Sequence, residues 1–350
     1  MATVLRHAKL DPTVVIGGKL NALGTGGARG AGDLLVAEAD ESDGSFLHLT
    51  PTIAVITNID HDHPDIFPTA ADYLDAFCEF AALLPENGRL IVSAKDPGVA
   101  DMVSEVTLPG VDLVTYGLAE DKTSGSKLDL MAIDSRPNQL GGTDFVLMAD
   151  QQTAGLVRLR VPGLHNVHNA LAAIAVALDL EVDFGQICRS LAGFGGVGRR
   201  FQLIGEVGGV TIIDDYAHHP TEIRATLAAA RQQYGDRRLW AVWQPHTFSR
   251  TRLLLPQFST CFADADRVVA LDVYRSRETD TLGMETEGFI SGIKHPNAVY
   301  VGQIDNAFEY LLDRVLPEDV VLTLGAGDGN IVGRVLLEAL QMRLESFRRK

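Results

Sequence analysis

The sequence is poor in cysteine and contains no long apolar run. Its three cysteines, Cys78, Cys188 and Cys261, are scattered without metal-ligand spacing, which is typical of reduced thiols in a cytosol. No apolar stretch is long enough to span a bilayer, and the first residues show no charged-then-apolar leader. We therefore expect a cytoplasmic protein that neither inserts into a membrane nor is secreted.

The chain also lacks an excess of basic residues. It carries 30 Lys and Arg against 46 Asp and Glu, a formal net charge of −16. A nucleic-acid partner is therefore not expected, because neutralising phosphates needs a basic face. An anionic nucleotide substrate stays compatible with this charge, since a few arginines and a metal can meet its phosphates locally. The length of 350 residues is typical of two or three domains.

A third absence is the phosphate-binding loop of many ATPases. The pattern Gly-x-x-x-x-Gly-Lys-[Ser/Thr] occurs nowhere in the chain. Residues 24–32 are rich in glycine but contain no lysine followed by a hydroxyl residue. This segment is predicted to form a hairpin or loop rather than a nucleotide site.

The most informative segment that is present reads DDYAHHPTE, residues 214–222. It follows the apolar run 210–213 and precedes a helical pattern, and Pro220 suits the first position of that helix. The two acids, the tyrosine and the two histidines are therefore predicted on the turn that leaves a buried strand. In α/β proteins ligands bind at such turns.

Two acidic clusters follow other apolar runs. EADESD, residues 38–43, follows the expected strand 34–37, and TNIDHDHPD, residues 57–65, follows the expected strand 53–57. Both clusters are predicted at the carboxyl ends of short strands that are buried on both faces. Carboxylates with an occasional imidazole suit Mg²⁺ or Mn²⁺, although either cluster alone can be a solvated loop.

Apolar runs alternate with helical patterns along the whole chain, which predicts an α/β fold. Residues 1–197 are expected to form a mostly parallel sheet with a β-rich extension and a helix at 169–180. Residues 198–350 are expected to form a second open sheet of the dinucleotide-binding type, with strands at 210–213, 240–243, 268–271 and 320–324. The glycines of residues 193–198 make that stretch a candidate hinge.

These motifs, together with GLHNVHN at 163–169, GRRF at 198–201 and QPHTFSRTR at 244–252, resemble those of the bacterial Mur ligases. The resemblance runs nearly end to end in the family's order. It implies a central ATPase domain and a carboxy-terminal amino-acid domain. It also implies ATP-dependent ligation in peptidoglycan synthesis, and DDYAHHP favours the member that joins L-alanine to UDP-N-acetylmuramate.

The resemblance implies a metal site in the first domain. Glu38 and His63 match the family's metal-ligand positions, with Mg²⁺ or Mn²⁺ as the ion. Asn58 is expected to support His63, whereas the role of His61 is left open, solvent exposure being one alternative.

The resemblance also implies the ATP contacts. His165, Asn166 and Asn169 match an adenine-contact motif, although Asn169 alone would more often cap a helix. Arg200 matches an arginine that binds ATP phosphate bidentately, which lysine would do poorly. Asp215 matches the acid that binds the ribose hydroxyls.

The resemblance also implies roles in substrate binding and in the reaction for residues of the second domain. Tyr216 and His218 match positions near the acyl phosphate and the incoming amine, and His218 could accept a proton from it. His246, Arg250 and Arg252 match a substrate-binding turn. Because the two arginines diverge on a helix, only one of them is expected to meet the substrate carboxylate.

Compared with the family, the chain is expected to be truncated at its amino terminus, without the UDP-sugar domain and the phosphate-binding loop. That absence argues against turnover, so a non-catalytic ligase remnant is the main alternative. A metallohydrolase, suggested by His61-x-His63-x-Asp65, is a minor one. The glycine-rich turn 325–330 is expected to contact substrate and no cofactor, and the oligomeric state is left open.

Overall fold

The computed structural model describes residues 1–20, 24–122 and 127–348. The chain divides into two compact units, Met1–Gly195 and Gly196–Lys350, so the division falls inside the glycine-rich stretch that was expected to act as a hinge. Each unit contains its own six-stranded sheet. None of the helices in the described ranges combines the length and the apolar character needed to cross a membrane.

The main sheet of the first unit has the order β4-β5-β6-β7-β8-β9. The strands are β4 (Ile53–Ile56), β5 (Arg89–Ser93), β6 (Asp112–Leu118), β7 (Leu130–Pro137), β8 (Thr143–Ala149) and β9 (Gln152–Arg158). β4 to β7 pair in parallel, whereas β7, β8 and β9 pair antiparallel. The predicted parallel sheet with a β-rich extension is therefore confirmed.

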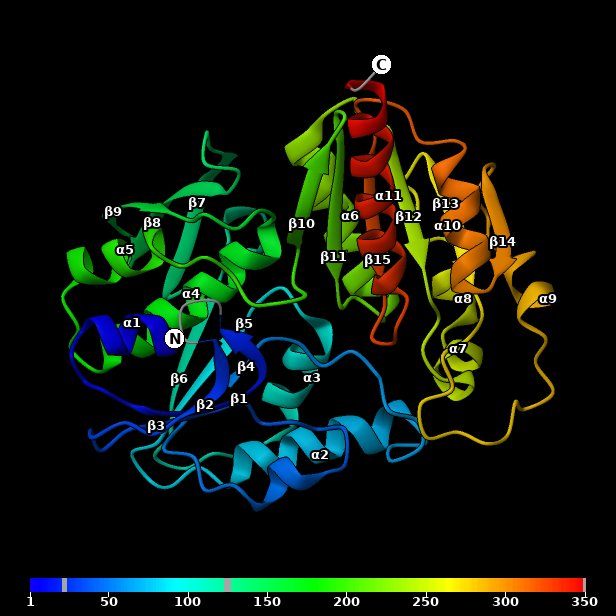
Figure 1. Ribbon diagram of the computed structural model, residues 1–350. Helices are drawn as coiled ribbons and strands as arrows, with labels where there is room; N and C mark the ends of the chain where they lie inside the picture. The colour runs from blue at the N-terminus through cyan, green and yellow to red at the C-terminus, as the bar shows by residue number, and fades with distance from the viewer. Residues whose placement is uncertain (21–23, 123–126, 349–350) are drawn as a thin grey trace. The chain divides into compact units, whose positions relative to one another are not determined.

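Helices cover both faces of this sheet (Figure 1). α2 (Ala70–Ala82) and α3 (Pro97–Glu105) share a core with β4 and β5. α1 (Ala2–His7), α4 (Leu164–Asp179) and α5 (Phe184–Ala192) share the other core with β6 to β9. The alanines of α4 are buried, which allows this helix to pack closely on the strands.

One strand is not where the sequence placed it. β3 (Leu35–Ala37) pairs in parallel with β1 (Thr13–Leu20), which pairs antiparallel with β2 (Thr25–Ala28), and these three form a separate small sheet (Figure 1). The prediction that β3 belongs to the main sheet and is buried on both faces is wrong, since Leu35 and Ala37 are exposed. Within the glycine-rich segment 24–32, residues 25–28 form β2, which pairs antiparallel with β1.

The sheet of the second unit has the order β10-β11-β15-β12-β13-β14. The strands are β10 (Gln202–Val207), β11 (Val210–Asp215), β12 (Leu239–Trp243), β13 (Arg267–Leu271), β14 (Ala298–Gly302) and β15 (Val320–Leu324). All neighbours are parallel except β10 and β11, which form an antiparallel hairpin. The predicted open α/β sheet is confirmed.

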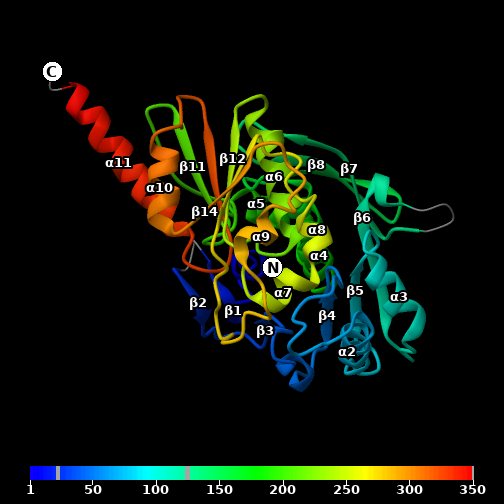
Figure 2. The same cartoon turned by 90° about the vertical axis from the view of Figure 1, so that its right-hand side faces the viewer.

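The helices of this unit lie on both faces of its sheet (Figure 2). One face packs against α6 (Pro220–Tyr234), α8 (Leu255–Phe258) and α9 (Thr286–Ile290), and α7 (Phe248–Leu253) precedes α8. The other face packs against α10 (Ile304–Leu312) and α11 (Asn330–Arg348). The connections after the adjacent strands β11 and β15 thus lead to helices on opposite faces, which opens a crevice at the carboxyl edge.

Candidate functional site

The two acids of the DDYAHHP motif lie in the strand, not on the turn. Asp214 and Asp215 are the last residues of β11 and are 2% and 5% exposed. The Asp215 carboxylate accepts hydrogen bonds from the backbone N–H of Phe201 and of Ala217, both at 2.8 Å. Burial raises the pKa of Asp215 to about 6, although Arg200 and these two bonds favour the ionised form. The expected contact with a ribose gains no support from this geometry and stays a prediction.

The turn after β11 is organised by Glu222, a residue that the sequence analysis did not single out. Its carboxylate accepts from the backbone N–H of His218 at 2.9 Å and of His219 at 3.2 Å. His219 is the N-cap of α6 and Pro220 is its first residue, as predicted. An acid three residues after the cap is the signal of a capping box, so the sequence pattern could have identified Glu222.

The charge of Glu222 is stabilised from several sides. Its Oε2 lies 3.3 Å from Nδ1 of His218, and its Oε1 accepts from Arg200 at 3.3 Å. Burial opposes the ionised form, but His218, Arg200 and the two backbone N–H groups outweigh it and lower the pKa of Glu222 to about 2. Glu222 is therefore a fixed negative charge beside His218 at neutral pH.

The two arginines of GRRF differ in their surroundings. Arg199 is half-buried and pairs with Asp214. Arg200 keeps about half of its side chain exposed. Both guanidinium groups lie over the ring of Tyr216, at 5.0 and 5.4 Å from its centroid. The ring of Tyr216 thus contacts two cations.

The predicted substrate residues of the second unit come together through their rings. The ring of Tyr216 lies 5.4 Å from that of His218, which lies 5.8 Å from that of His246. His246 stacks on Tyr274 at 5.5 Å, and Tyr274 was not predicted. The only sequence signal for Tyr274 is that it is an aromatic residue in a loop that follows a strand.

The two arginines of the QPHTFSRTR turn lie in different surroundings, as expected. Arg250 is buried, and its Nη1 lies 3.0 Å from Nδ1 of His246. Arg252 is exposed and is not brought to the group of rings. Only Arg250 therefore belongs to the cluster that Tyr216, His218 and His246 form.

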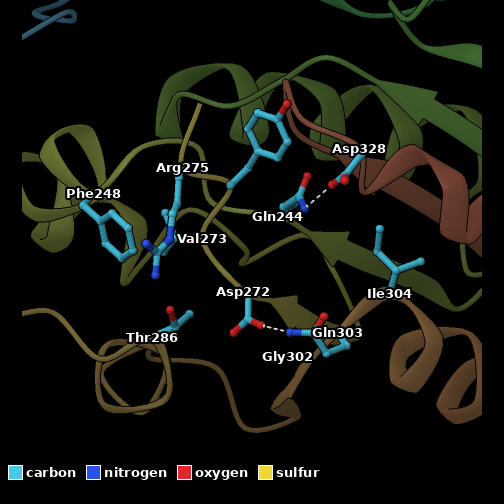
Figure 3. A pocket seen from close by; sticks show the side chains of 11 residues that line it. Gln244, Phe248, Asp272, Val273, Arg275, Thr286, Gly302, Gln303, Ile304 and Asp328 are labelled. Atoms are coloured by element: carbon cyan, nitrogen blue, oxygen red, sulfur yellow. Dashed lines mark hydrogen bonds between the residues drawn. The ribbon is translucent and has the colours of Figure 1, made fainter. Parts of the chain in front are cut away.

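A cavity of about 470 Å³ opens beside this cluster, at the carboxyl ends of β12 to β15 (Figure 3). Tyr274 lines it together with Gln244, and Gln244 donates to Asp328 at 2.7 Å. Asp272, which accepts from Gln303, lies on its other side (Figure 3). The lining is polar, which suits a small hydrophilic ligand.

The glycine-rich turn after β15 packs against Gln244. The side-chain oxygen of Gln244 accepts from the backbone N–H of Gly329 at 2.8 Å. A Cβ on Gly327 would lie 2.4 Å from that oxygen and 2.6 Å from the ring of Tyr274. Only glycine fits so close an approach. Through Asp328 the turn borders the cavity, and its contact with substrate stays a prediction.

In the first unit the two expected metal ligands have different partners. Glu38 is exposed, and its Oε2 accepts from the backbone N–H of Gly17 in β1 at 2.7 Å. His63 lies 3.7 Å from Glu41 and 3.8 Å from Asp62, measured from Nε2 to the carboxylate oxygens. Its φ of 53° is unusual for a residue other than glycine, and such strain often marks a functional position.

Glu41 and Asp62 are acids of the predicted clusters that were not singled out. Burial raises the pKa of Glu41, and it raises that of Tyr73 as well, with the charges of Glu41 and Asp62 adding to the effect. Within the described ranges, however, no three His, Cys, Asp or Glu side chains are grouped so that they could hold a metal. The donors are chemically suited to Mg²⁺, but these side chains alone do not form a metal site.

The loop around His63 differs from the prediction at Asn58. His61, whose role was left open, is half-buried, and its Nε2 lies 2.8 Å from the carbonyl oxygen of Phe67. Asn58 is exposed and donates to Thr57, its own neighbour, so it does not support His63 among the residues described. The loop is instead fixed by Asp96, which accepts from the backbone N–H of Ile59 at 2.9 Å.

The expected adenine motif lies inside a helix. α4 begins at Leu164 with Gly163 as its N-cap, so His165 and Asn166 occupy the first turn and Asn169 is an exposed helical residue, not a cap. The Asn166 side chain donates to the carbonyl of Pro162 at 2.7 Å. The adenine contact of these residues stays a prediction.

The fold is that of ligases with a central α/β ATPase domain followed by a second α/β domain. The chain belongs to the Mur ligase family, whose members are ATP-dependent ligases. The model of the Mur ligase middle domain matches residues 28–177, and that of the Mur ligase, glutamate ligase domain matches residues 199–327.

Curated relatives support this assignment. A UDP-N-acetylmuramate–L-alanine ligase of Geobacter sulfurreducens is 47% identical over 97% of this chain and 72% of its own length. One of Sorangium cellulosum is 44% identical over 99% of this chain and 72% of its own length. These coverages do not establish the expected amino-terminal truncation, which stays a prediction.

Solved structures share the fold. The UDP-N-acetylmuramate–alanine ligase of Thermotoga maritima is similar with a TM-score of 0.77 and 26% identity, over 98% of this chain and 72% of that one. A murein peptide ligase from Psychrobacter arcticus has a TM-score of 0.70 at 23% identity, over 97% and 73% of the two chains. The latter likeness concerns the fold alone.

Proposed function

We propose that the chain carries out ATP-dependent ligation of L-alanine to the carboxylate of UDP-N-acetylmuramate, in peptidoglycan precursor synthesis. The observation that carries this proposal is the cluster of Tyr216, His218, His246 and Arg250 at one sheet edge. It is supported by 47% identity to a relative of that name. We further propose that the reaction requires Mg²⁺ and takes place in the cytoplasm.

The proposed chemistry has two steps. The γ-phosphoryl group of ATP passes to the substrate carboxylate, which releases ADP and forms an acyl phosphate. The ammonium group of L-alanine gives a proton to His218, and the free amine attacks the acyl carbon. The tetrahedral intermediate then expels phosphate, which takes up the second amine proton, and leaves an amide. Arg200 would bind phosphate, and Arg250 would bind a carboxylate.

L-Alanine-dependent release of phosphate from ATP tests this proposal, with purified chain, UDP-N-acetylmuramate and Mg²⁺. Because the sequence has no phosphate-loop lysine, and one lost transition-state donor costs about 10²–10³ in rate, the assay must detect slow turnover. Phosphate release that depends on both substrates supports the ligase. Its absence would favour the alternative, a ligase fold without turnover.

The metallohydrolase alternative gains no support. Of its three suggested ligands, His61 contacts the carbonyl oxygen of Phe67, and the described residues contain no group that could hold a metal. The family assignment also accounts for the second unit, which that alternative left unexplained.

A further inference from the structure

We propose that Glu222 is a positioning residue that holds His218 as its Nδ1–H tautomer, so that Nε2 is the nitrogen that accepts a proton. The tautomer follows from geometry alone. Its consequence for catalysis rests on the proposed function.

Two acceptors meet Nδ1 of His218. The carbonyl oxygen of Tyr216 lies 3.0 Å away, and Oε2 of Glu222 lies 3.3 Å away. Neither a carbonyl oxygen nor a carboxylate can donate a hydrogen, so Nδ1 must carry the proton in the neutral ring. The lone pair of neutral His218 is therefore on Nε2.

The carboxylate of Glu222 is itself held in place. The backbone N–H groups of His218 and His219 donate to the same oxygen that faces the imidazole, at 2.9 and 3.2 Å. Arg200 donates to the other oxygen at 3.3 Å. Glu222 thus orients the ring of His218 from a fixed position on the first turn of α6.

The neighbouring histidine carries the opposite assignment. Nδ1 of His246 lies 3.0 Å from Nη1 of Arg250, and a guanidinium can only donate. Nδ1 of His246 is therefore the acceptor, and its proton is on Nε2. The two rings, 5.8 Å apart, are held in opposite tautomers by a carboxylate and by an arginine.

Among the residues that the structure describes, charged and titratable groups from several elements lie around His218. Glu222 lies on α6, Tyr216 follows β11, His246 follows β12, and Arg200 precedes β10 and contacts Glu222. Arg250 of α7 acts through His246. The carboxylate nearest to His218 favours its protonated form, and Arg200 weakens that effect in part.

In the proposed reaction this arrangement gives His218 one task. Nε2 takes a proton from the ammonium of the acceptor amino acid, which leaves a neutral amine and an imidazolium. The imidazolium then donates Nδ1–H to Glu222 and to the carbonyl of Tyr216, and its positive charge is balanced by the carboxylate. Glu222 itself does not change protonation.

The test is ¹⁵N nuclear magnetic resonance of the full chain with ¹⁵N-labelled histidine, in the absence of substrates. His218→Gln and His246→Gln assign the two signals. Above the pKa we expect a protonated Nδ1 for His218 and a protonated Nε2 for His246. A neutral His218 with its proton on Nε2 would overturn the proposal.

Glu222→Gln supplies the second measurement. Glutamine keeps an oxygen for the backbone N–H groups and suits the capping box, but it removes the charge and can donate to Nδ1. We expect the titration midpoint of His218 to fall by about one pH unit and the Nδ1–H preference to be lost. Glu318→Gln, which removes a charge on an exposed side chain, should leave both unchanged. An unaltered tautomer and midpoint in folded Glu222→Gln would contradict the proposal.

The free-chain spectra separate this proposal from the proposed function. If the wild-type chain releases no phosphate, the ligase proposal fails while the tautomer assignment can still stand. If it is active, Glu222→Gln should shift the acidic limb of its pH–rate profile in the same direction as the His218 midpoint. A role of Glu222 in helix capping alone would not move that limb.

Discussion

Arg199 and Asp214 form a partly buried ion pair, with Nε of the arginine 3.1 Å from Oδ2 of a carboxylate that is 2% exposed. The same guanidinium donates to the carbonyl oxygen of Gly325 at 2.8 Å. The hydroxyl of Thr323 occupies the other oxygen of Asp214 at 2.8 Å. One arginine therefore ties the GRRF loop to the ends of β11 and β15.

Replacing this arginine should cost stability rather than ligand affinity. Arg199→Ala leaves Asp214 buried without its cation, so we expect the free energy of unfolding to fall by about 3 kcal/mol. Arg200→Ala is the matched control, because Arg200 forms an exposed pair that is worth less than about 1 kcal/mol. Urea unfolding at pH 7 measures both. Equal losses in the two variants would contradict the assignment.

Replacing Arg200 should instead lower the affinity for nucleotide. If it binds ATP phosphate bidentately, Arg200→Lys keeps the charge but loses the paired hydrogen bonds, and nucleotide affinity should fall about tenfold. Titration with ATP, followed by calorimetry, measures the change. Arg224→Lys on α6, also exposed, should bind as the wild type does. Unchanged affinity in Arg200→Lys would exclude the phosphate role.

The sequence predicted the strands that are apolar and continuous. β11, β12, β13 and β15 have every residue buried or nearly so, and their apolar runs were recognised directly. Asp214 and Asp215 were placed on a turn because two acids seldom end a buried strand. Here Arg199, Thr323 and two backbone N–H groups compensate both carboxylates, and these partners are remote in sequence or belong to the backbone.

The sequence did not predict which distant segments pair with each other. β3 was assigned to the main sheet because its apolar residues resemble a buried strand. Its actual partner, β1, contains Gly17 and Gly18, which weaken the strand signal, so β1 was not predicted at all. The ring cluster of the second unit was predicted residue by residue from a resemblance, but Tyr274 and Glu222 join it through contacts that no spacing reveals.

The stability of the second unit should depend on pH through Glu222. Its pKa falls from 4.5 to about 2 on folding, so its contribution is present above pH 4.5 and is lost as the pH falls toward 2. The difference in unfolding free energy between wild type and Glu222→Gln should grow over this range to about 1 kcal/mol, a modest value because solvent reaches the carboxylate.

Urea unfolding between pH 2 and 7 measures that difference. Asp215 has the opposite sign, because its raised pKa gives a contribution that is present below pH 3.8 and is lost as the pH rises through about 6. Both proteins retain Asp215, whose contribution is constant below pH 3.8, so the change in that lower range reports on Glu222 even though Glu222 also adds to the raised pKa of Asp215. A difference that does not change between pH 2 and 5 would contradict the assignment to Glu222.

The close approach at Gly327 gives a prediction for the cavity. A methyl group there would collide with Gln244 and Tyr274, so Gly327→Ala should displace the turn and lower the unfolding free energy by about 1–3 kcal/mol. If substrate binds beside Tyr274, affinity for L-alanine should fall as well. Gly288→Ala is the control, because nothing lies within 4 Å of its added methyl group. A Gly327→Ala chain as stable as the control would show that the turn adapts.

The metal assignment is open to a direct test, because Glu38 and His63 have distinct partners in the structure. If both bind Mg²⁺ with nucleotide, Glu38→Ala and His63→Ala should each weaken Mg²⁺-dependent ATP binding by at least about tenfold. Binding measured in EDTA should not differ between these variants and wild type. His48→Ala, which removes an exposed histidine, is the matched control. Because the Glu38 carboxylate accepts from the backbone N–H of Gly17, a metal bound to that carboxylate should also alter the amide signal of Gly17. An unchanged Gly17 signal together with unchanged affinities would remove Glu38 from the metal site and leave Glu41 and Asp62, which lie beside His63, as the acids to replace next.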